Sequence, residues 1–331
     1  MKQELAPTAV ARSSEVGSAK PSDVIDVSHL RKTYGRTVAV DDVSFSVRED
    51  EIFGILGPNG AGKTTAVECI IGLRRPDAGT IRVLGLNPES DRDREELHTL
   101  VGAQLQVSAL PAKLTVRENL ELYRSFYYHP ADVGELVTTL GLGDKLGSYY
   151  KDLSGGQKQR LAVAVALIGQ PKIAVLDEMT TGLDPQARRD TWDLIEGIRA
   201  RGVTILLVTH YMDEAQRLCD RVALFDQGRI VALGTPSELA AEAGGGKHVT
   251  FVPSRTFDDR LLTDLPNVTS VEHHGPRVTV VGKGELVNAV IQTLATNGVN
   301  AEDVTSGSAT LEDAFLKLTG RHIHEPEEVN A

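Results

Sequence analysis

The sequence predicts an α/β fold: a mixed sheet covered by helices, followed by a small α+β domain. Three observations support this prediction. Short apolar runs typical of strands alternate with longer helical stretches up to about residue 245. A glycine-rich loop, residues 57–64, lies between a buried strand and a helix. After Ala243-Gly-Gly-Gly246, which we interpret as a linker, the pattern of strands and helices changes.

Ordered structure is expected to begin near Val24, because residues 1–23 are polar and rich in serine, alanine and charge, which is typical of a disordered tail. Val43, Phe45 and Val47 alternate with polar residues, the period of a half-buried strand. Residues 51–56 form an apolar run that predicts a buried strand. A further strand is expected around 81–83, after a turn at Pro76-Asp-Ala-Gly79.

A helical subdomain is predicted from about residue 90 to 168. Within it, Thr115-Val-Arg-Glu118 and Ser154-Gly-Gly-Gln157 are capping boxes that open helices. Further strands are expected at 173–176 and 203–208, with helices capped at Asp184 and Thr235. Strands that alternate with helices in this way indicate a parallel sheet covered on both faces.

The smaller C-terminal domain is expected at residues 246–320, followed by a frayed tail at 321–331. Its predicted order is strand, helix, strand, strand, helix, strand. Strands are indicated at 248–252, 268–271 and 278–281. A helix is indicated by leucine and valine at helical spacing, namely Leu286, Val290 and Leu294.

Composition argues against several classes of protein. The net charge of −11 disfavours a nucleic-acid partner, because phosphate contact requires a basic surface. No apolar run approaches the roughly 20 residues that cross a bilayer, and residues 1–22 lack the apolar core of a secretory signal. Cys69 and Cys219 form no CxxC pair, and Cys69 is expected to be buried in a reducing, cytoplasmic protein.

The loop Gly57-Pro-Asn-Gly-Ala-Gly-Lys63-Thr64 matches the P-loop pattern. Its glycines allow backbone N–H groups to surround phosphates, and the helix that follows directs its positive end toward them. Lys63 supplies a cation, and the Thr64 hydroxyl can ligate Mg²⁺. The pattern predicts nucleotide binding, but by itself it does not separate the classes of P-loop protein.

Two further features distinguish between the classes of P-loop protein: an acidic pair and a second glycine-rich helix start. Asp177 and Glu178 end a buried strand, where one carboxylate can hold Mg²⁺ and the other can activate water. The segment 153–157, Leu-Ser-Gly-Gly-Gln, lies 20 residues before Asp177 (177 − 157) and predicts a second anion site. One domain cannot easily bring both loops onto one nucleotide, whereas two copies arranged head to tail can.

With this segment the sequence resembles the ATP-binding cassette (ABC) ATPases over roughly residues 24–245, and Leu-Ser-Gly-Gly-Gln is their signature. The resemblance implies ATP hydrolysis, with ATP and Mg²⁺ as cofactors. The catalytic residues that it implies are Glu178 as base, His210 as γ-phosphate sensor and Gln106 near the attacking water. The implied ATP-binding residues are Tyr34, which would stack on adenine, and Gly57, Pro58, Asn59, Gly60, Ala61, Gly62, Lys63, Thr64 and Thr65.

The resemblance also implies a signature that contacts the partner's nucleotide, a dimer-interface loop at Asp184 and Mg²⁺ ligands. The implied ligands are Thr64, Gln106 and Asp177, and the signature residues are Leu153, Ser154, Gly155, Gly156 and Gln157. Several alternatives stay open. Gln104 lies near Gln106, Leu105 replaces a proline usual in the family, and Met179 replaces another. Tyr34 could instead be a core residue, Gln106 a surface glutamine and His210 a structural one.

The resemblance implies a transporter subunit that powers export through a separate integral-membrane permease. It would work as a homodimer or cassette pair on the cytoplasmic face of the cell membrane. The alternative is a soluble ABC ATPase of a non-transport assembly. Coiled-coil repair proteins are disfavoured because the segment between residues 64 and 153 holds no sustained heptads. We expect this protein to have no nucleic-acid partner.

The direction of transport is indicated by the C-terminal segment. This segment, which closes with residues 311–320, resembles the tail domain of drug-exporting cassettes of the daunorubicin-resistance type, which implies export of a drug or other hydrophobic compound. The same residues also predict an amphipathic helix that packs Leu311, Phe315 and Leu318 on the small C-terminal sheet. The pair His273-His274 is not expected to bind a metal, because adjacent strand residues point to opposite faces.

Overall fold

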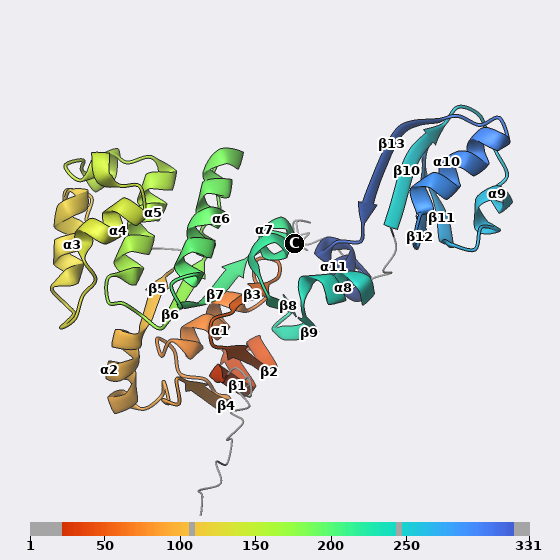
Figure 1. Cartoon of the computed structure of the whole chain (residues 1–331). Helices are drawn as coiled ribbons and strands as arrows, with labels where there is room; N and C mark the ends of the chain where they lie inside the picture. Colours follow the sequence, from red (N-terminus) through yellow and green to blue (C-terminus); the bar gives the residue numbers. More distant parts are fainter. Residues whose placement is uncertain (1–21, 106–109, 243–246, 321–331) are drawn as a thin grey trace, which may run out of the picture.

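The computed structural model describes residues 22–105, 110–242 and 247–320. Its central layer is a six-stranded sheet in the order β5-β6-β7-β3-β8-β9 (Figure 1). All neighbouring pairs are parallel except β8 and β9, so the predicted mixed sheet is confirmed. The strands are β3 (Ile52–Leu56), β5 (Val101–Gln104), β6 (Ile173–Asp177), β7 (Thr204–Thr209), β8 (Arg221–Asp226) and β9 (Arg229–Gly234).

Both faces of this sheet are buried, as expected of parallel strands. Alternate residues of β3 enter two different cores: Ile52 and Leu56 pack with the helices α5, α6 and α7, and Phe53 and Ile55 pack with α1 and the antiparallel sheet. The helices around the sheet are α1 (Lys63–Ile70), α2 (Asp91–Leu100), α5 (Gly155–Leu167), α6 (Pro185–Arg199) and α7 (Met212–Leu218).

A three-stranded antiparallel sheet in the order β2-β1-β4 covers one of these cores. The alternation that predicted a strand at 43–47 places Val43, Phe45 and Val47 inside. The ring of Phe45 stacks on that of Phe53 with the centroids 5.2 Å apart, which joins the two sheets. The strands are β1 (Asp23–Tyr34), β2 (Thr37–Arg48) and β4 (Ala78–Val83).

The stretch from 90 to 168 is mostly helical, but one part of that prediction is wrong, because residues 101–104 form β5 at the edge of the main sheet. The four residues Val-Gly-Ala-Gln are too few to show a strand period, and only the valine favours a strand, so the signal is weak. A Cβ on Gly102 would lie 2.0 Å from the carbonyl oxygen of Ala166, so this glycine lets α5 approach the strand. The capped helices here are α3 (Val116–Arg124), α4 (Val133–Thr139) and α5, with 3₁₀ turns at Gly143–Lys145 and Tyr150–Asp152.

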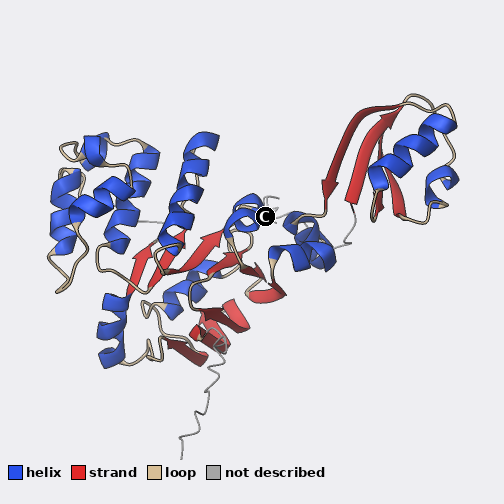
Figure 2. Ribbon diagram, in the orientation of Figure 1, coloured by secondary structure: helices blue, strands red, loops and turns tan. Residues whose placement is uncertain are grey.

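Residues 247–308 form a separate antiparallel sheet in the order β11-β12-β10-β13, backed by two helices (Figure 2). The predicted order of elements is confirmed, and together with the strand order it is the ferredoxin-like arrangement. Its core includes Val249, Phe251 and Val290. The elements are β10 (Lys247–Pro253), α9 (Arg260–Thr263), β11 (Val268–His274), β12 (Arg277–Gly282), α10 (Leu286–Thr296) and β13 (Ala301–Ser308).

The last helix, α11 (Leu311–Thr319), does not pack on this small sheet, so that expectation is wrong. It lies against α8 (Pro236–Glu242) and α7 (Figure 1), and Leu311 and Phe315 belong to the same core as Ile52 and Leu56 of the central sheet. Leu318 is half exposed, and the Lys317 ammonium donates to the Glu242 carbonyl oxygen at 3.0 Å. Helical spacing identified the apolar face of this helix but not the surface that the face covers.

Both cysteine thiols are buried. Burial raises the pKa of Cys69 to about 11 and holds that of Cys219 well above its usual value. Because the thiolate is the reactive form, we expect neither thiol to react with Ellman's reagent in the folded protein, and both to react in guanidinium chloride. A rapidly reacting thiol under native conditions would contradict this prediction.

Candidate functional site

Three loops meet at one edge of the central sheet, because β6, β7 and β3 are parallel neighbours and their carboxyl ends lie together. The glycine-rich loop follows β3, the acidic pair Asp177-Glu178 ends β6, and His210 follows β7. The register sets Asp177 opposite Val208 on β7, and Leu56 of β3 opposite Thr209. The structure therefore brings together residues that are up to 153 positions apart in the sequence (210 − 57).

The loop is held in shape by Lys63 and by close backbone contacts. The Lys63 ammonium is buried and donates to the carbonyl oxygens of Gly57 at 2.8 Å and Pro58 at 2.9 Å. Burial lowers the pKa of Lys63, whereas the charges of Glu178 and Asp177 oppose that shift. A positive group at the helix start, next to two carboxylates, suits a site for a phosphate and a cation.

Gly62 shows why the loop needs glycine. Its φ is +98°, and a Cβ built on it would lie 2.1 Å from the carbonyl oxygen of Ala39. An open cavity of about 250 Å³ lies over the loop, with Glu178 on one side. Ala39, on β2, also lines it and carries no sequence signal of its own. The other lining residues are all predicted ones: Asn59, Gly60, Ala61, Gly62, Lys63, Thr64 and Thr65.

Glu178 and His210 form a close pair beside this cavity. The Nδ1 atom of His210 lies 3.3 Å from Oε1 of Glu178, and both side chains are largely buried. The backbone of Glu178 is left-handed, with φ at +50°, a conformation that non-glycine residues adopt at a cost and that clusters at functional sites. Its N–H donates to the Val208 carbonyl oxygen at 2.9 Å, which holds this turn against β7. A carboxylate fixed over the cavity in this way can accept a proton from water.

Two predicted residues lie at the margin of this site or beyond the described chain. Tyr34 ends β1 with 41% of its surface exposed, so the alternative of a core tyrosine is wrong. The guanidinium of Arg74, which sequence reasoning missed, lies 5.2 Å from the Tyr34 ring centre. Stacking of Tyr34 on adenine stays a prediction. Gln106 lies outside the described residues, while nearby Gln104 is buried at the end of β5.

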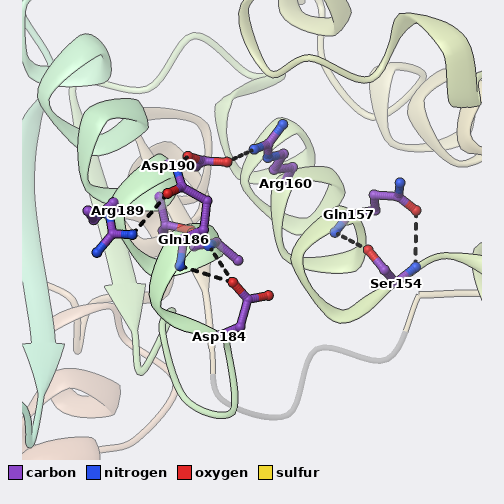
Figure 3. Close-up of polar contacts among 9 residues, drawn as sticks. Ser154, Gln157, Arg160, Asp184, Gln186, Arg189 and Asp190 are labelled. Atoms are coloured by element: carbon purple, nitrogen blue, oxygen red, sulfur yellow. Dashed lines mark hydrogen bonds and ion pairs between the residues drawn. The ribbon is translucent and has the colours of Figure 1, made fainter.

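A second cavity, of about 300 Å³, lies between the starts of α5 and α6 (Figure 3). Ser154 and Gln157 form the predicted capping box. The Gln157 N–H donates to the Ser154 hydroxyl at 3.3 Å, and the Ser154 N–H donates to Oε1 of the Gln157 side chain at 3.0 Å. Asp184 caps α6 by accepting two backbone N–H groups, each at 3.0 Å. The lining residues are Ser154, Gly155, Gly156, Gln157, Arg160, Gly182, Leu183, Asp184, Ala187 and Thr191.

The glycines of this second cavity are not explained by packing inside the chain. A Cβ on Gly155 or on Gly156 would meet its nearest neighbour, Leu183 or Ala187, at an ordinary 3.8 Å. Leu153 is buried beneath them. Within the described residues, the lining of this cavity and that of the cavity over the loop have no member in common. One chain thus carries two separate sites with glycine-rich helix starts.

Comparison with known proteins identifies the family. Residues 40–181 match the family described as "ABC transporter". The Nod factor export ATP-binding protein I of Ralstonia nicotianae is 37% identical over 309 residues, which cover 91% of this chain and 95% of that protein. The chain belongs to the ABC transporter family. A daunorubicin resistance ATP-binding protein, DrrA3 of Streptomyces coeruleorubidus, is 36% identical over 317 residues, 89% of this chain and 96% of the relative.

Solved structures agree with this ABC assignment. The cbiO1 protein of Clostridium perfringens, part of the ABC transporter complex cbiONQ, has a TM-score of 0.61 at 27% identity and covers 66% of this chain and 91% of its own. A dimeric ATP-binding cassette in a post-hydrolysis state, bound to ADP and Pi, has a TM-score of 0.58 at 26% identity and covers 64% and 98%. The chain is an ABC ATP-binding subunit with ATPase activity, and the predicted fold class is confirmed.

Replacing Lys63 by alanine is expected to raise the Kd for ATP about 10- to 100-fold, because a hydrogen bond to a charged group contributes roughly 1.5–3 kcal/mol. Titration with a fluorescent ATP analogue would measure the change. The control is Lys172→Ala, which removes an exposed lysine away from the cavity. Unchanged affinity in the Lys63 variant would show that the loop is not the phosphate site.

Proposed function

We propose that two copies of this chain pair head to tail around two ATP molecules, and that hydrolysis at their interface drives export through a separate permease. The observation that carries the proposal is the presence in one chain of two separate cavities, each beside a glycine-rich helix start of the kind that binds phosphate. Each nucleotide would lie between the loop of one copy and the signature segment 153–157 of the other. The dimeric solved cassette bound to ADP and Pi supports this pairing.

Within each site the residues have distinct roles. The loop residues 57–65 bind the phosphates, Tyr34 stacks on adenine, Glu178 accepts the proton of the attacking water, and His210 senses the γ-phosphate. Asp184 lies at the start of α6 and contacts the partner copy. Gln106 completes the site from the segment after β5.

Mg²⁺ is the expected metal, since the oxygen donors fit a hard cation. Thr64 lines the cavity over the loop, and Asp177 ends β6 at the same edge of the sheet. These two residues, with Gln106, would hold the ion. When bound, the ion supplies positive charge against the charge that develops on the phosphates.

Export is supported by the names of the relatives, a Nod factor export protein and a daunorubicin resistance protein, which match over the C-terminal domain as well as the cassette. In the described part of the chain, no helix is both long enough and apolar enough to span a bilayer. We therefore assign passage of a drug or other hydrophobic compound to a separate integral-membrane permease, with this subunit on the cytoplasmic face. In this scheme residues 24–245 form the ATPase domain and 246–320 the appended domain.

The test is a pull-down of tagged Glu178→Gln protein from detergent-solubilised cells with and without ATP. We expect a polytopic membrane protein to be recovered, more of it with ATP. The matched control carries Lys63→Ala as well and should show no ATP dependence. Recovery of soluble partners alone would favour an ABC ATPase of a non-transport assembly.

Gly156→Ala tests the pairing separately from the fold. The new methyl group has room in the single chain, so the melting temperature should not fall. It would face the partner's nucleotide, so turnover should fall about tenfold or more while ATP binding to the monomer is unchanged. Full turnover in this variant would contradict the head-to-tail arrangement.

A further inference from the structure

A buried carboxyl group lies behind the site just described. Glu214, in the first turn of α7, has no exposed surface, and its Oε1 accepts a hydrogen bond from Nε1 of Trp192 on α6 at 3.2 Å. The side chains of Thr209 and Thr180 lie close enough to this carboxyl group to lower its pKa, but the Thr180 hydroxyl and Oε2 of Glu214 have no hydrogen-bond partner among the described residues. In the described chain no lysine, arginine or histidine forms an ion pair with Glu214; the titratable groups around it are Asp213 and the Cys219 thiol. Burial raises the pKa of Glu214, and the charge of Asp213 acts in the same direction.

A carboxyl group in such surroundings is costly to bury, and a methionine or leucine would fill the same space without that cost. Apart from these polar neighbours, α7 packs in an apolar core that includes Ala215, Leu218 and Met179. Packing alone therefore does not account for an acidic residue here. Its polar neighbours, which lie next to the catalytic residues in the chain, offer a reason.

Each neighbour of Glu214 adjoins a part of the ATPase site. Thr209 directly precedes His210, and its hydroxyl accepts the Tyr211 N–H at 3.0 Å, so it fixes the backbone on both sides of the histidine. Thr180 follows Glu178 by two residues in the turn after β6. Trp192 adjoins Thr191, which lines the second cavity, between the starts of α5 and α6; we call it the signature cavity because residues 154–157 line it.

We propose that Glu214 is a positioning residue for ATP hydrolysis: it holds the turns that carry His210 and Glu178 in register and ties them to α6 through Trp192. The 3.3 Å contact between His210 and Glu178 then depends on a group that touches neither substrate nor metal. Because α6 begins at the signature cavity, the same contact links the nucleotide site of one copy to the surface that would meet the nucleotide of the other. This inference rests on the roles proposed above for Glu178 and His210.

The first test compares kcat and KM for ATP in full-length variants. Glu214→Ala is expected to lower kcat at least about tenfold, because small displacements of catalytic groups cost up to about 100-fold, and to leave KM unchanged. Glu214→Gln keeps an acceptor for Trp192 and a shape close to the carboxyl group, so it should recover most of kcat. The matched control is Cys219→Ala, a buried truncation at the end of the same helix, which should keep wild-type kcat.

A second readout uses the single tryptophan of the chain, Trp192. In a Glu178→Gln background, ATP is expected to change the tryptophan emission, and adding Thr209→Val should abolish that change while ATP still binds. The comparison of Glu178→Gln with and without Thr209→Val also tests the proposal if Glu214→Ala does not fold. Emission that responds to ATP equally with and without Thr209→Val would overturn the proposal.

The outcomes separate this inference from the proposed function. Wild-type turnover in Glu178→Gln would remove the proposed catalytic base, and the inference would fall with it. An inactive Glu178→Gln together with wild-type kcat in Glu214→Ala would overturn the positioning role alone. Equal losses in Glu214→Ala and Cys219→Ala, or no recovery with Glu214→Gln, would also overturn it, since the effect would then be one of packing.

Discussion

Glu178→Gln is expected to lower kcat for ATP hydrolysis about 100- to 1000-fold, because general base catalysis contributes about 10²–10⁴-fold and glutamine cannot accept the proton. ATP binding should persist, since the amide keeps the shape of the carboxylate and Lys63 is unchanged. A coupled-enzyme assay measures turnover, and size-exclusion chromatography with ATP should show a dimer that the wild-type protein does not accumulate.

The matched control for this substitution is Glu121→Gln, which makes the same chemical change at a half-exposed residue of α3 that pairs with Arg124. It should hydrolyse ATP at the wild-type rate. If Glu178→Gln retained wild-type turnover, the base would have to be another group. The left-handed backbone of Glu178 would then need an explanation other than catalysis.

Phe315→Ala is expected to destabilise the protein by about 3–5 kcal/mol, the usual cost of truncating a buried phenylalanine. The ring has no exposed surface and lies in the main core with residues of α7 and α8, although the chain reaches it only after the small C-terminal sheet. In denaturant unfolding, the midpoint of the main transition should therefore lie at a lower denaturant concentration than in the wild-type protein. ATPase activity should be lost at this same, lower concentration.

Leu318→Ala, on the same helix but half exposed, is the control and should change stability by no more than about 0.5 kcal/mol. The two variants discriminate between the two surfaces that α11 could cover. If Phe315→Ala weakened only an independent transition of the 247–308 sheet, the packing against α7 and α8 would be contradicted.

Short-range patterns in the sequence predicted much of the site. The capping boxes at Thr115 and Ser154 and the cap at Asp184 each depend on residues two or three apart, and all three form as expected. The glycine-rich loop could also be predicted from a local pattern, since Gly62 needs a positive φ that glycine adopts readily.

What the sequence did not predict depends on contacts between distant residues. Nothing near Ala39 shows that its carbonyl oxygen closes over Gly62, and the short strand β5 is defined by its parallel partner β6. Glu214 offered one usable sign, because it shares a helical face with Leu218, where an acidic residue is out of place. Its link to Trp192 required the fold.

The position of α11 has a consequence for how the protein is made. The ribosome must synthesise residues 243–310 between α8 and α11, which takes roughly 3–14 s at about 5–20 residues per second. During that interval the apolar surface of α7 and α8 that Phe315 covers is still open on the nascent chain. Completion of the core that α7 and α8 share with Phe315 therefore waits until α11 has been synthesised. A ribosome that stops within the appended domain releases a cassette that still lacks part of its core.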